Sequence, residues 1–139
     1  MTIDYKELNI SMYPQLEAGW KLLPDNATGL GDDKKSIEVY LLRNPRCSIA
    51  AFHENELIGA VLAGHDGRRA ILNHLFVLPE FRRKGVAREL VTRCFDELRN
   101  QGITRAAIFI HKTNTAAQEF WKVLGFEKVD FIETYGCNL

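Results

Sequence analysis

The residues best suited to bind an anion lie in one short stretch, Arg82–Arg88, with the sequence Arg-Arg-Lys-Gly-Val-Ala-Arg. It follows an apolar run that ends at Pro79 and directly precedes a segment with helical spacing of apolar residues. The free N–H groups and the dipole of a helix N-terminus attract phosphate. Gly85 lets the backbone approach such a ligand, and Ala87 leaves the next turn clear. The four basic side chains would repel the helix dipole unless an anion lies among them, so the stretch predicts a diphosphate site, with a solvated surface turn as the alternative.

The elements that position this turn alternate between strands and helices. The apolar pattern predicts strands over residues 3–8, 47–53, 57–64, 70–78 and 106–110, and a last alternating strand at Val129 and Phe131. It predicts helices between Ser11 and Pro24, over residues 37–41, from Val86 to Gly102 and from Thr115 to Gly125. Ala106–Ile110 shows no alternation, so we expect it to be buried on both faces. The order β, α, α, β, β, β, α, β, α, β predicts a mixed α/β fold with helices on both faces of the sheet.

Length and charge narrow the class of protein. A chain of 139 residues predicts a single domain over residues 1–139. Eighteen basic and 18 acidic residues give a net charge of zero, which argues against nonspecific nucleic-acid or membrane-surface binding. No apolar run approaches the ~20 residues of a membrane span, and the N-terminus lacks signal-peptide features, so we expect a cytoplasmic protein. Cys47, Cys94 and Cys137 are predicted to be buried and reduced, and no metal site is expected.

Two motifs resemble those of the GCN5-related N-acetyltransferase (GNAT) family. The first is Arg82-x-x-Gly85-x-Ala87 after a strand, which is similar to that family's acetyl-CoA signature. The second is Asn114-x-x-Ala117-x-x-Phe120-Trp121-x-x-x-Gly125-Phe126. Within the family, the likeness is to small bacterial members of the ribosomal-protein alanine acetyltransferase type. The resemblance implies a mostly antiparallel sheet that splays between its fourth and fifth strands, and acetyl transfer from acetyl-CoA to a primary amine by direct attack in a ternary complex.

The resemblance also assigns residues to the cofactor. The splayed fourth strand would bind the pantetheine arm, the basic turn would bind the pyrophosphate, and the helix after Asn114 would close over both. The residues implied are Leu75, Phe76, Val77, Arg82, Arg83, Lys84, Gly85, Val86, Ala87, Arg88, Asn114, Ala117, Phe120 and Trp121. Asn114 could instead be a helix cap, but Thr115 is a competing cap that would leave the Asn114 side chain free for a ligand.

The catalytic groups depart from the family pattern. Trp121 occupies the usual position of a tyrosine general acid, and Asn73 that of a basic residue. Neither side chain can move a proton at neutral pH. Strand alternation predicts that His74 points away from the Asn73 face unless a bulge re-aims it, so a structural histidine is favoured. The backbone N–H of Val77 is the expected oxyanion donor. The remaining proton-transfer candidates are His111, Glu80 and Tyr135.

The acceptor follows only loosely from the sequence. Without an evident base, an α-amine is favoured over a lysine because its pKa of ~7.7–8.0 is lower than ~10.4. The acceptor would be a small molecule or a peptide or protein N-terminus, bound near the loop Pro24–Asp33, where Asp25, Asp32 and Asp33 are solvated or attract an amine. Trp20 is expected in the core. A CoA-binding regulatory module without catalysis is the alternative function, a nucleic-acid phosphate patch is a third, and a homodimer is compatible with either enzyme or module.

Overall fold

The computed structural model describes residues 1–24 and 27–139. These residues form two compact units, Met1–Ile108 and Phe109–Leu139, and each unit is treated by itself below. The larger unit contains the whole sheet and three of the four α-helices, and the smaller contains α4 (Thr115–Val123). The interpretation of residues 1–139 as one domain stays a prediction.

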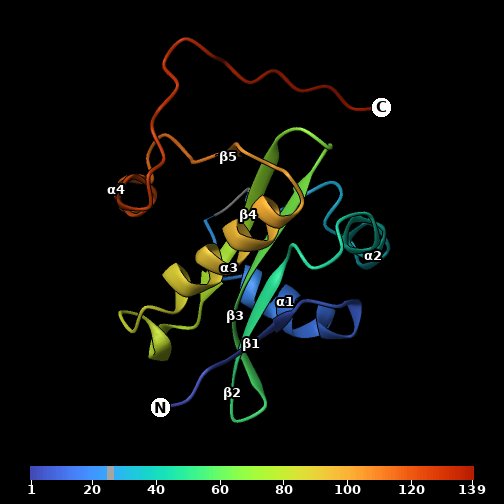
Figure 1. Ribbon diagram of the computed structural model, residues 1–139, viewed down its shortest axis with the longest axis vertical. Helices are drawn as coiled ribbons and strands as arrows, with labels where there is room; N and C mark the ends of the chain where they lie inside the picture. Colours follow the sequence, from blue (N-terminus) through green and yellow to red (C-terminus); the bar gives the residue numbers. More distant parts are fainter. Residues whose placement is uncertain (25–26) are drawn as a thin grey trace. The chain divides into compact units, whose positions relative to one another are not determined.

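The larger unit is built on a five-stranded sheet with the spatial order β1-β2-β3-β4-β5 (Figure 1). The strands are β1 (Asp4–Glu7), β2 (Ile49–His53), β3 (Glu56–His65), β4 (Ala70–Val77) and β5 (Ala106–Ile108). The first four strands pair antiparallel in sequence order, whereas β5 runs parallel to β4. The predicted mixed, mostly antiparallel sheet is therefore confirmed.

Helices cover both faces of this sheet. One face carries α1 (Tyr13–Trp20), preceded by the 3₁₀ turn η1 (Ile10–Met12), together with α2 (Lys34–Arg43). The other carries α3 (Val86–Asn100), which follows the 3₁₀ turn η2 (Pro79–Phe81). The apolar stripe predicted for α3, formed by Val86, Leu90, Cys94 and Leu98, is buried as a helix packed on a sheet requires, and Val91 is buried with it.

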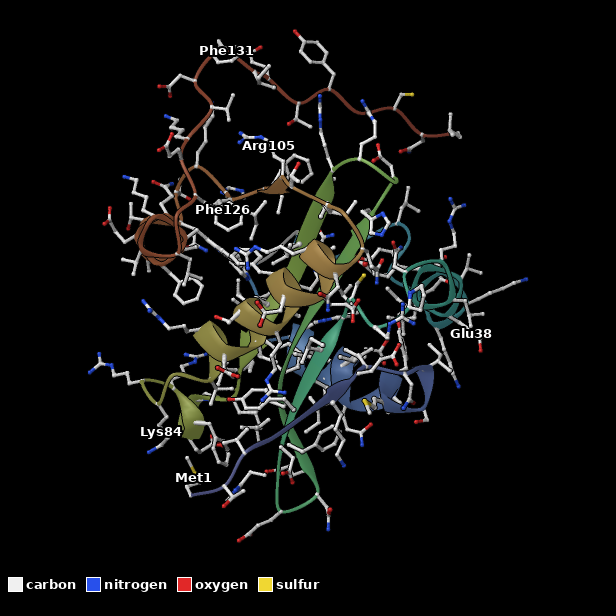
Figure 2. The ribbon with its side chains drawn as sticks, in the orientation of Figure 1. Met1, Glu38, Lys84, Arg105, Phe126 and Phe131 are labelled. Atoms are coloured by element: carbon white, nitrogen blue, oxygen red, sulfur yellow. The ribbon has the colours of Figure 1, made fainter. Side chains whose placement is uncertain are left out.

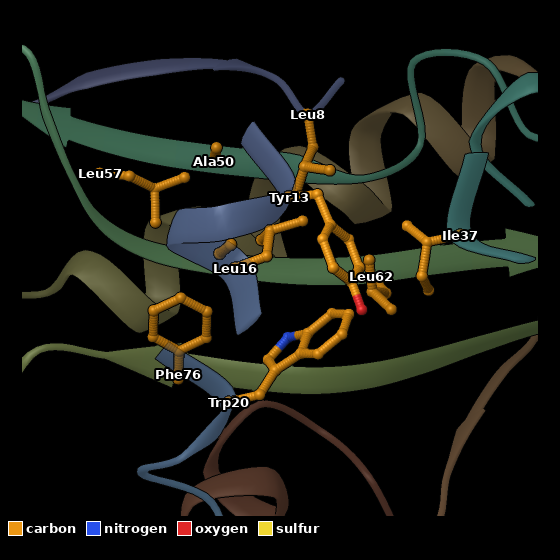
Figure 3. Close-up of a cluster of buried hydrophobic side chains, with 10 residues drawn as sticks. Leu8, Tyr13, Leu16, Trp20, Ile37, Ala50, Leu57, Leu62 and Phe76 are labelled. Atoms are coloured by element: carbon orange, nitrogen blue, oxygen red, sulfur yellow. The ribbon is translucent and has the colours of Figure 1, made fainter. Parts of the chain in front are cut away.

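The core between α1 and the sheet is tightly packed at one contact. Phe76 of β4 lies in a buried cluster with Leu16 and Trp20 of α1, and Trp20 is only 6% exposed, so its predicted place in the core is confirmed (Figure 3). Gly19 lies directly against the Phe76 ring, because a Cβ atom on Gly19 would come within 2.1 Å of ring carbons. The close approach of α1 to β4 therefore depends on this glycine.

Two predicted strands differ from the structure. The fifth strand ends at Ile108 rather than residue 110, and its residues are half-buried or exposed rather than buried on both faces. It pairs with β4 alone, as an edge strand. The last predicted strand is absent from the described residues: the segment around Val129 and Phe131 is irregular, and Phe131 is 86% exposed. Alternation of apolar and polar residues is not enough to form a strand, because a strand also needs a neighbouring strand for its backbone hydrogen bonds.

The cysteines and the helix lengths complete the comparison with the sequence. Cys47 and Cys94 are buried free thiols, as predicted. Cys137 is free but exposed, so its predicted burial is wrong; it lies in the irregular segment after α4. Among the helices of the described chain, none combines the length and the apolar character needed to cross a membrane.

Candidate active site

The site begins at the point along β4 where its pairing with β5 ends. The parallel ladder between β4 and β5 runs only from Ala70 opposite Ala106 to Leu72 opposite Ile108. In the part of the chain that the structure describes, β4 residues 73–77 therefore have a strand partner on the β3 side alone. This is the splay that the family resemblance implied, and it leaves backbone groups of β4 on an open edge.

A bulge in β4 sets the direction of its side chains. Ala60 of β3 lies opposite Phe76, and Leu62 lies opposite Asn73, so one β3 residue faces His74 and Leu75 together. His74 adopts a left-handed backbone conformation with φ of 54°. A bulge of this kind interrupts alternation. As a result, Asn73 and His74 line the same cavity, which is the exception to strand alternation that the sequence analysis allowed for a bulge.

The cavity has a volume of about 400 Å³. Its walls come from the loop between α1 and α2, from α2 itself and from the two strands that meet at the bulge. The lining residues are Ala27, Thr28, Gly29, Leu30, Gly31, Asp32, Ile37, Tyr40, Leu62, Asn73 and His74. All of them belong to the larger unit, so the cavity is formed within one compact body.

His74 and Asp32 form a hydrogen-bonded pair in this cavity. The distance from His74 Nε2 to Asp32 Oδ1 is 3.0 Å, and the side chains are 13% and 20% exposed. The second carboxylate oxygen of Asp32 accepts the Gly29 N–H at 2.8 Å, and its backbone carbonyl accepts the Tyr13 hydroxyl at 2.7 Å. The Trp20 ring lies edge-on to the imidazole, 5.0 Å between centroids. These contacts fix the imidazole, and its Nδ1 makes no hydrogen bond with the described residues.

The role of Asp32 could not be found from the sequence. The sequence analysis predicted that Asp32 is either solvated or attracts an amine directly. In the structure, Asp32 instead orients His74, which lies 42 positions later in the chain. Asp33 has a different function, because its side chain accepts the Ser36 N–H and caps α2. Those Ser36 hydrogen bonds lower the pKa of Asp33. Asp25 lies outside the described residues.

Tyr40 is a cavity residue that the sequence analysis placed only on a helix. Burial raises the pKa of its phenol well above the ordinary value, so it is neutral at physiological pH. A Cβ on Gly64 would lie 2.9 Å from its hydroxyl oxygen, which shows how closely α2 packs on β3 here. Helical spacing indicated that Tyr40 is covered, but not that it contributes to a cavity wall.

The open edge of β4 presents the N–H of Val77. The next N–H, that of Leu78, donates to the Ile58 carbonyl of β3 at 2.8 Å. Because successive N–H groups of an extended strand point to opposite edges, the Val77 N–H points toward the edge where β5 has ended. The Val77 carbonyl accepts from Arg82 Nε at 3.1 Å, which ties the start of the basic turn to the end of β4.

The basic turn has the backbone of an anion cradle. Arg83 and Gly85 are both left-handed, with φ of 61° and 81°. Gly85 is the N-cap of α3 and provides no side-chain cap, so the first N–H groups of the helix are left for another acceptor. No atom lies within 4 Å of a Cβ built on Gly85. Lys84 lies exposed in the turn (Figure 2). Alternating left- and right-handed residues before a helix form a nest for phosphate.

The residues predicted on the second motif belong to the smaller unit. Asn114 is the N-cap of α4, and its Oδ1 accepts the Ala117 N–H at 3.0 Å, so the expectation that Thr115 is the cap and Asn114 is free is wrong. Trp121 packs edge-on between Phe120 and Phe126, with ring centroids 5.1 Å apart in each pair. Their cofactor roles stay predictions.

Three further proton-transfer candidates are exposed side chains. His111 contacts Thr113 at 3.1 Å through Nδ1, Tyr135 is 88% exposed, and Glu80 lies exposed in η2. Glu80 does not line the cavity described above, and His111 and Tyr135 belong to the smaller unit, so their proton-transfer roles stay predictions. Within the larger unit, the structure brings His74 together with Asn73.

Known proteins share both the sequence pattern and the fold. The model of the Acetyltransferase (GNAT) family matches residues 11–126. An acetyltransferase of Pectobacterium atrosepticum is 32% identical over 108 residues, which cover 78% of this chain and 76% of the relative. The chain belongs to the GNAT family of acetyltransferases.

Solved structures agree at the level of the fold. The PaiA N-acetyltransferase of Thermoplasma acidophilum in complex with coenzyme A has a TM-score of 0.79 and 19% identity, over 95% of this chain and 94% of that one. The aminoglycoside N-acetyltransferase AAC(6')-Iy in complex with CoA has a TM-score of 0.77 and 23% identity, over 99% and 96%. These similarities support the fold assignment independently of the motifs.

Proposed function

We propose that this acetyltransferase moves the acetyl group of acetyl-CoA to a neutral primary amine by direct attack in a ternary complex, with His74 as the base. The observation that carries the proposal is the β4 bulge. It turns His74 into the cavity beside Asn73, within the same stretch of β4 that lies on the open edge. An acceptor amine in the cavity and a thioester along the edge would then meet at one place.

The residues around the open edge suit acetyl-CoA. The exposed cations and the uncapped N-terminus of α3 form a turn that suits a pyrophosphate, and the edge of β4 around Phe76 and Val77 offers backbone groups to an amide-containing arm. When bound, acetyl-CoA supplies the activated acyl group. Binding by the second motif, through Asn114, Ala117, Phe120 and Trp121, is part of the proposal.

The His74–Asp32 pair removes a difficulty that the sequence left open. With Nε2–H donated to Asp32, the imidazole Nδ1 is an acceptor for an amine proton. A carboxylate that holds the tautomer and stabilises the imidazolium is a recurrent device for such bases. His74 can accept the proton that the amine loses on attack, so the absence of a base no longer argues for an α-amine. Asn73 would orient the amine through its side-chain amide.

The chemical step can be written with its atoms balanced. The amine nitrogen forms a bond to the thioester carbon while its proton passes to His74, and the C–S bond then breaks to release the thiolate. The Val77 N–H would stabilise the oxyanion between these steps. The proton held by His74, or one from solvent, neutralises the thiolate. Trp121 takes no part, because an indole N–H is not a practical proton source.

This arrangement weighs against a regulatory module without catalysis. That alternative rested on Asn73 and Trp121 standing where proton-transfer groups are expected. The oriented histidine beside Asn73 supplies the missing group. The net charge of zero weighs against the phosphate patch as a nucleic-acid site.

Two measurements test the proposal. Acetyl-CoA at ~100 times its dissociation constant should add about 2.7 kcal/mol to the free energy of unfolding and raise the melting temperature by several degrees. Release of free thiol from acetyl-CoA should then depend on both the enzyme concentration and an added primary amine. The absence of a melting shift at millimolar acetyl-CoA would contradict the site, and a shift without amine-dependent thiol release would restore the regulatory alternative.

A further inference from the structure

We infer that Tyr13 of α1 is a positioning residue for the proposed base: its hydroxyl holds the backbone of Asp32, and Asp32 in turn holds the His74 imidazole in one tautomer. This inference rests on the proposed function, because it concerns the base assigned there. It follows from a series of contacts that joins α1, the loop before α2 and β4.

The hydrogen bonds inside the loop before α2 do not place Asp32 against β4. The Asp32 N–H donates to the Gly29 carbonyl at 3.1 Å, and the Asp32 carboxylate accepts the Gly29 N–H at 2.8 Å. Both bonds join residues of one short turn, so they shape the turn without fixing it to the rest of the molecule. Among the described residues outside this loop and β4, Tyr13 alone hydrogen-bonds Asp32, through its hydroxyl and the Asp32 carbonyl at 2.7 Å.

The surroundings of the Tyr13 hydroxyl keep it a donor. The side chain is 9% exposed, burial raises the pKa of its phenol, and nearby carboxylates raise that pKa further. These carboxylates belong to Glu17, Asp33 and Asp32. The phenol is therefore protonated at neutral pH, and its O–H is available to the Asp32 carbonyl.

The aromatic rings of α1 connect Tyr13 to His74 by a second route. Tyr13 and Trp20 lie two turns apart on α1, with ring centroids 6.0 Å apart and planes at 89° (Figure 3). Trp20 in turn contacts the His74 ring, with centroids 5.0 Å apart. Edge-on packing of this kind depends on the rings and not on the hydroxyl. Removal of the Tyr13 hydroxyl alone therefore breaks the hydrogen bond to Asp32 and leaves the ring packing in place.

A displaced Asp32 would release the imidazole of His74. Because a carboxylate only accepts hydrogen bonds, its contact with Nε2 keeps the proton on Nε2 and leaves Nδ1 able to accept. Without this contact the neutral ring can carry its proton on Nδ1, and that tautomer cannot take an amine proton at Nδ1. Tyr13 thus acts on the reaction through Asp32, without touching the reacting atoms.

The tautomer of His74 tests the inference without cofactor or acceptor. Heteronuclear NMR of the ring nitrogens distinguishes the two neutral tautomers, and the His74 signals are those missing from His74→Gln. We expect the Nε2–H form to predominate in the wild type and the Nδ1–H form to gain in Tyr13→Phe.

Tyr5→Phe is the matched control for this measurement. Tyr5 lies in β1, and its ring packs on Arg93 of α3, on the opposite face of the sheet from α1. The control should keep the wild-type tautomer. An unchanged tautomer in Tyr13→Phe, or the same change in Tyr5→Phe, would overturn the inference.

Kinetics measure what the hydrogen bond contributes to the reaction. Thiol release from acetyl-CoA is followed with 2-phenylethylamine, alaninamide or 1,5-diaminopentane, whichever amine the wild type turns over fastest. We expect Tyr13→Phe to lower kcat roughly two- to tenfold, the net contribution of one hydrogen bond. The acetyl-CoA melting shift should be unchanged, which shows that the variant is folded, and Tyr5→Phe should keep the wild-type kcat.

A double-mutant cycle identifies the route by which Tyr13 acts. If it acts through the Asp32 carboxylate, Tyr13→Phe should lower kcat less when added to Asp32→Asn than when made in the wild type. Equal losses in the two backgrounds would overturn the inference. No thiol release by the wild type with any amine would instead contradict the proposed function, and the tautomer of His74 would still decide the inference.

Discussion

The two sides of the C-terminal half of β4 differ in how their charges are satisfied. On the cavity side, His74 and Asp32 are hydrogen-bonded to one another, and Asp32 makes two further contacts with Gly29 and Tyr13. On the side of the basic turn, Arg83, Lys84 and Arg88 are exposed and make no ion pair with any part of the chain that the structure describes. The charged and polar groups on the cavity side are thus paired within the chain before a ligand binds, whereas the cations of the basic turn are not.

This difference indicates what each region is built to receive. A preorganised, internally paired group suits a neutral ligand and acts on its proton without further rearrangement. Exposed cations beside an uncapped helix N-terminus gain stability only when an anion arrives. Under the proposed function, the basic turn binds the charged cofactor and the His74–Asp32 pair accepts the amine proton, so the two tasks fall to different regions. Three substitutions test this separation, in order of decreasing expected effect.

The largest effect is expected from His74→Gln on the cavity side. Glutamine retains a hydrogen-bonding amide but cannot accept a proton, so kcat should fall roughly 100- to 10,000-fold, the range for loss of a general base. The acetyl-CoA melting shift should be unchanged, because the basic turn is intact. A pH–rate profile checks the assignment, because the limb of kcat/KM that reports the general base should be absent from the variant. A variant that keeps this limb would show that another group is the base.

The second effect is expected from Gly85→Glu in the basic turn. A carboxylate there would occupy the anion cradle. The stabilisation of about 2.7 kcal/mol expected from acetyl-CoA at ~100 times the dissociation constant should vanish, and the melting shift with it. No neighbouring atom obstructs the new side chain, although a non-glycine residue at φ of 81° costs about 1–2 kcal/mol. Gly67→Glu is the matched control, since Gly67 also has a positive φ and open space. An undiminished shift in Gly85→Glu would remove the pyrophosphate from this turn.

The smallest effect is expected from Asp32→Asn. The amide keeps one acceptor oxygen for His74, gives up the acceptor of the Gly29 N–H and cannot stabilise the imidazolium by charge, so kcat should fall about tenfold while acetyl-CoA binding is unaffected. Asp33→Asn serves as the control, because Asp33 caps α2 and asparagine is an equally good N-cap. Steady-state kinetics on the pair measure the contribution of charge at His74. Equal rates in both variants would reduce Asp32 to a purely structural residue.

The sequence predicted the features that depend on local structure. The basic turn and the buried stripe of α3 follow from residues within a few positions of one another. The role of Asn114 as the N-cap of α4 could also have been predicted, because asparagine is a stronger N-cap than threonine. The order of elements up to α4 is confirmed.

The features that the sequence missed depend on contacts between distant segments. The bulge at His74 is defined by which β3 residues face β4, and the partner of His74 lies in a loop 42 positions earlier. Alternation at Val129 and Phe131 predicted a strand, but a strand exists only where another one offers hydrogen bonds. Strand alternation is a local rule, and the bulge interrupts it at His74. The sequence therefore did not identify His74 as the candidate base.

The contact between Gly19 and the Phe76 ring has a consequence for engineering the enzyme. Any side chain at position 19 would collide with the ring at 2.1 Å, and Phe76 is two residues from the bulge. A library aimed at new acceptors should therefore leave α1 at this point untouched, since variation there would displace β4 together with the reacting groups. The loop residues 27–31 are exposed, so variation there can reshape the pocket while β4 keeps its place.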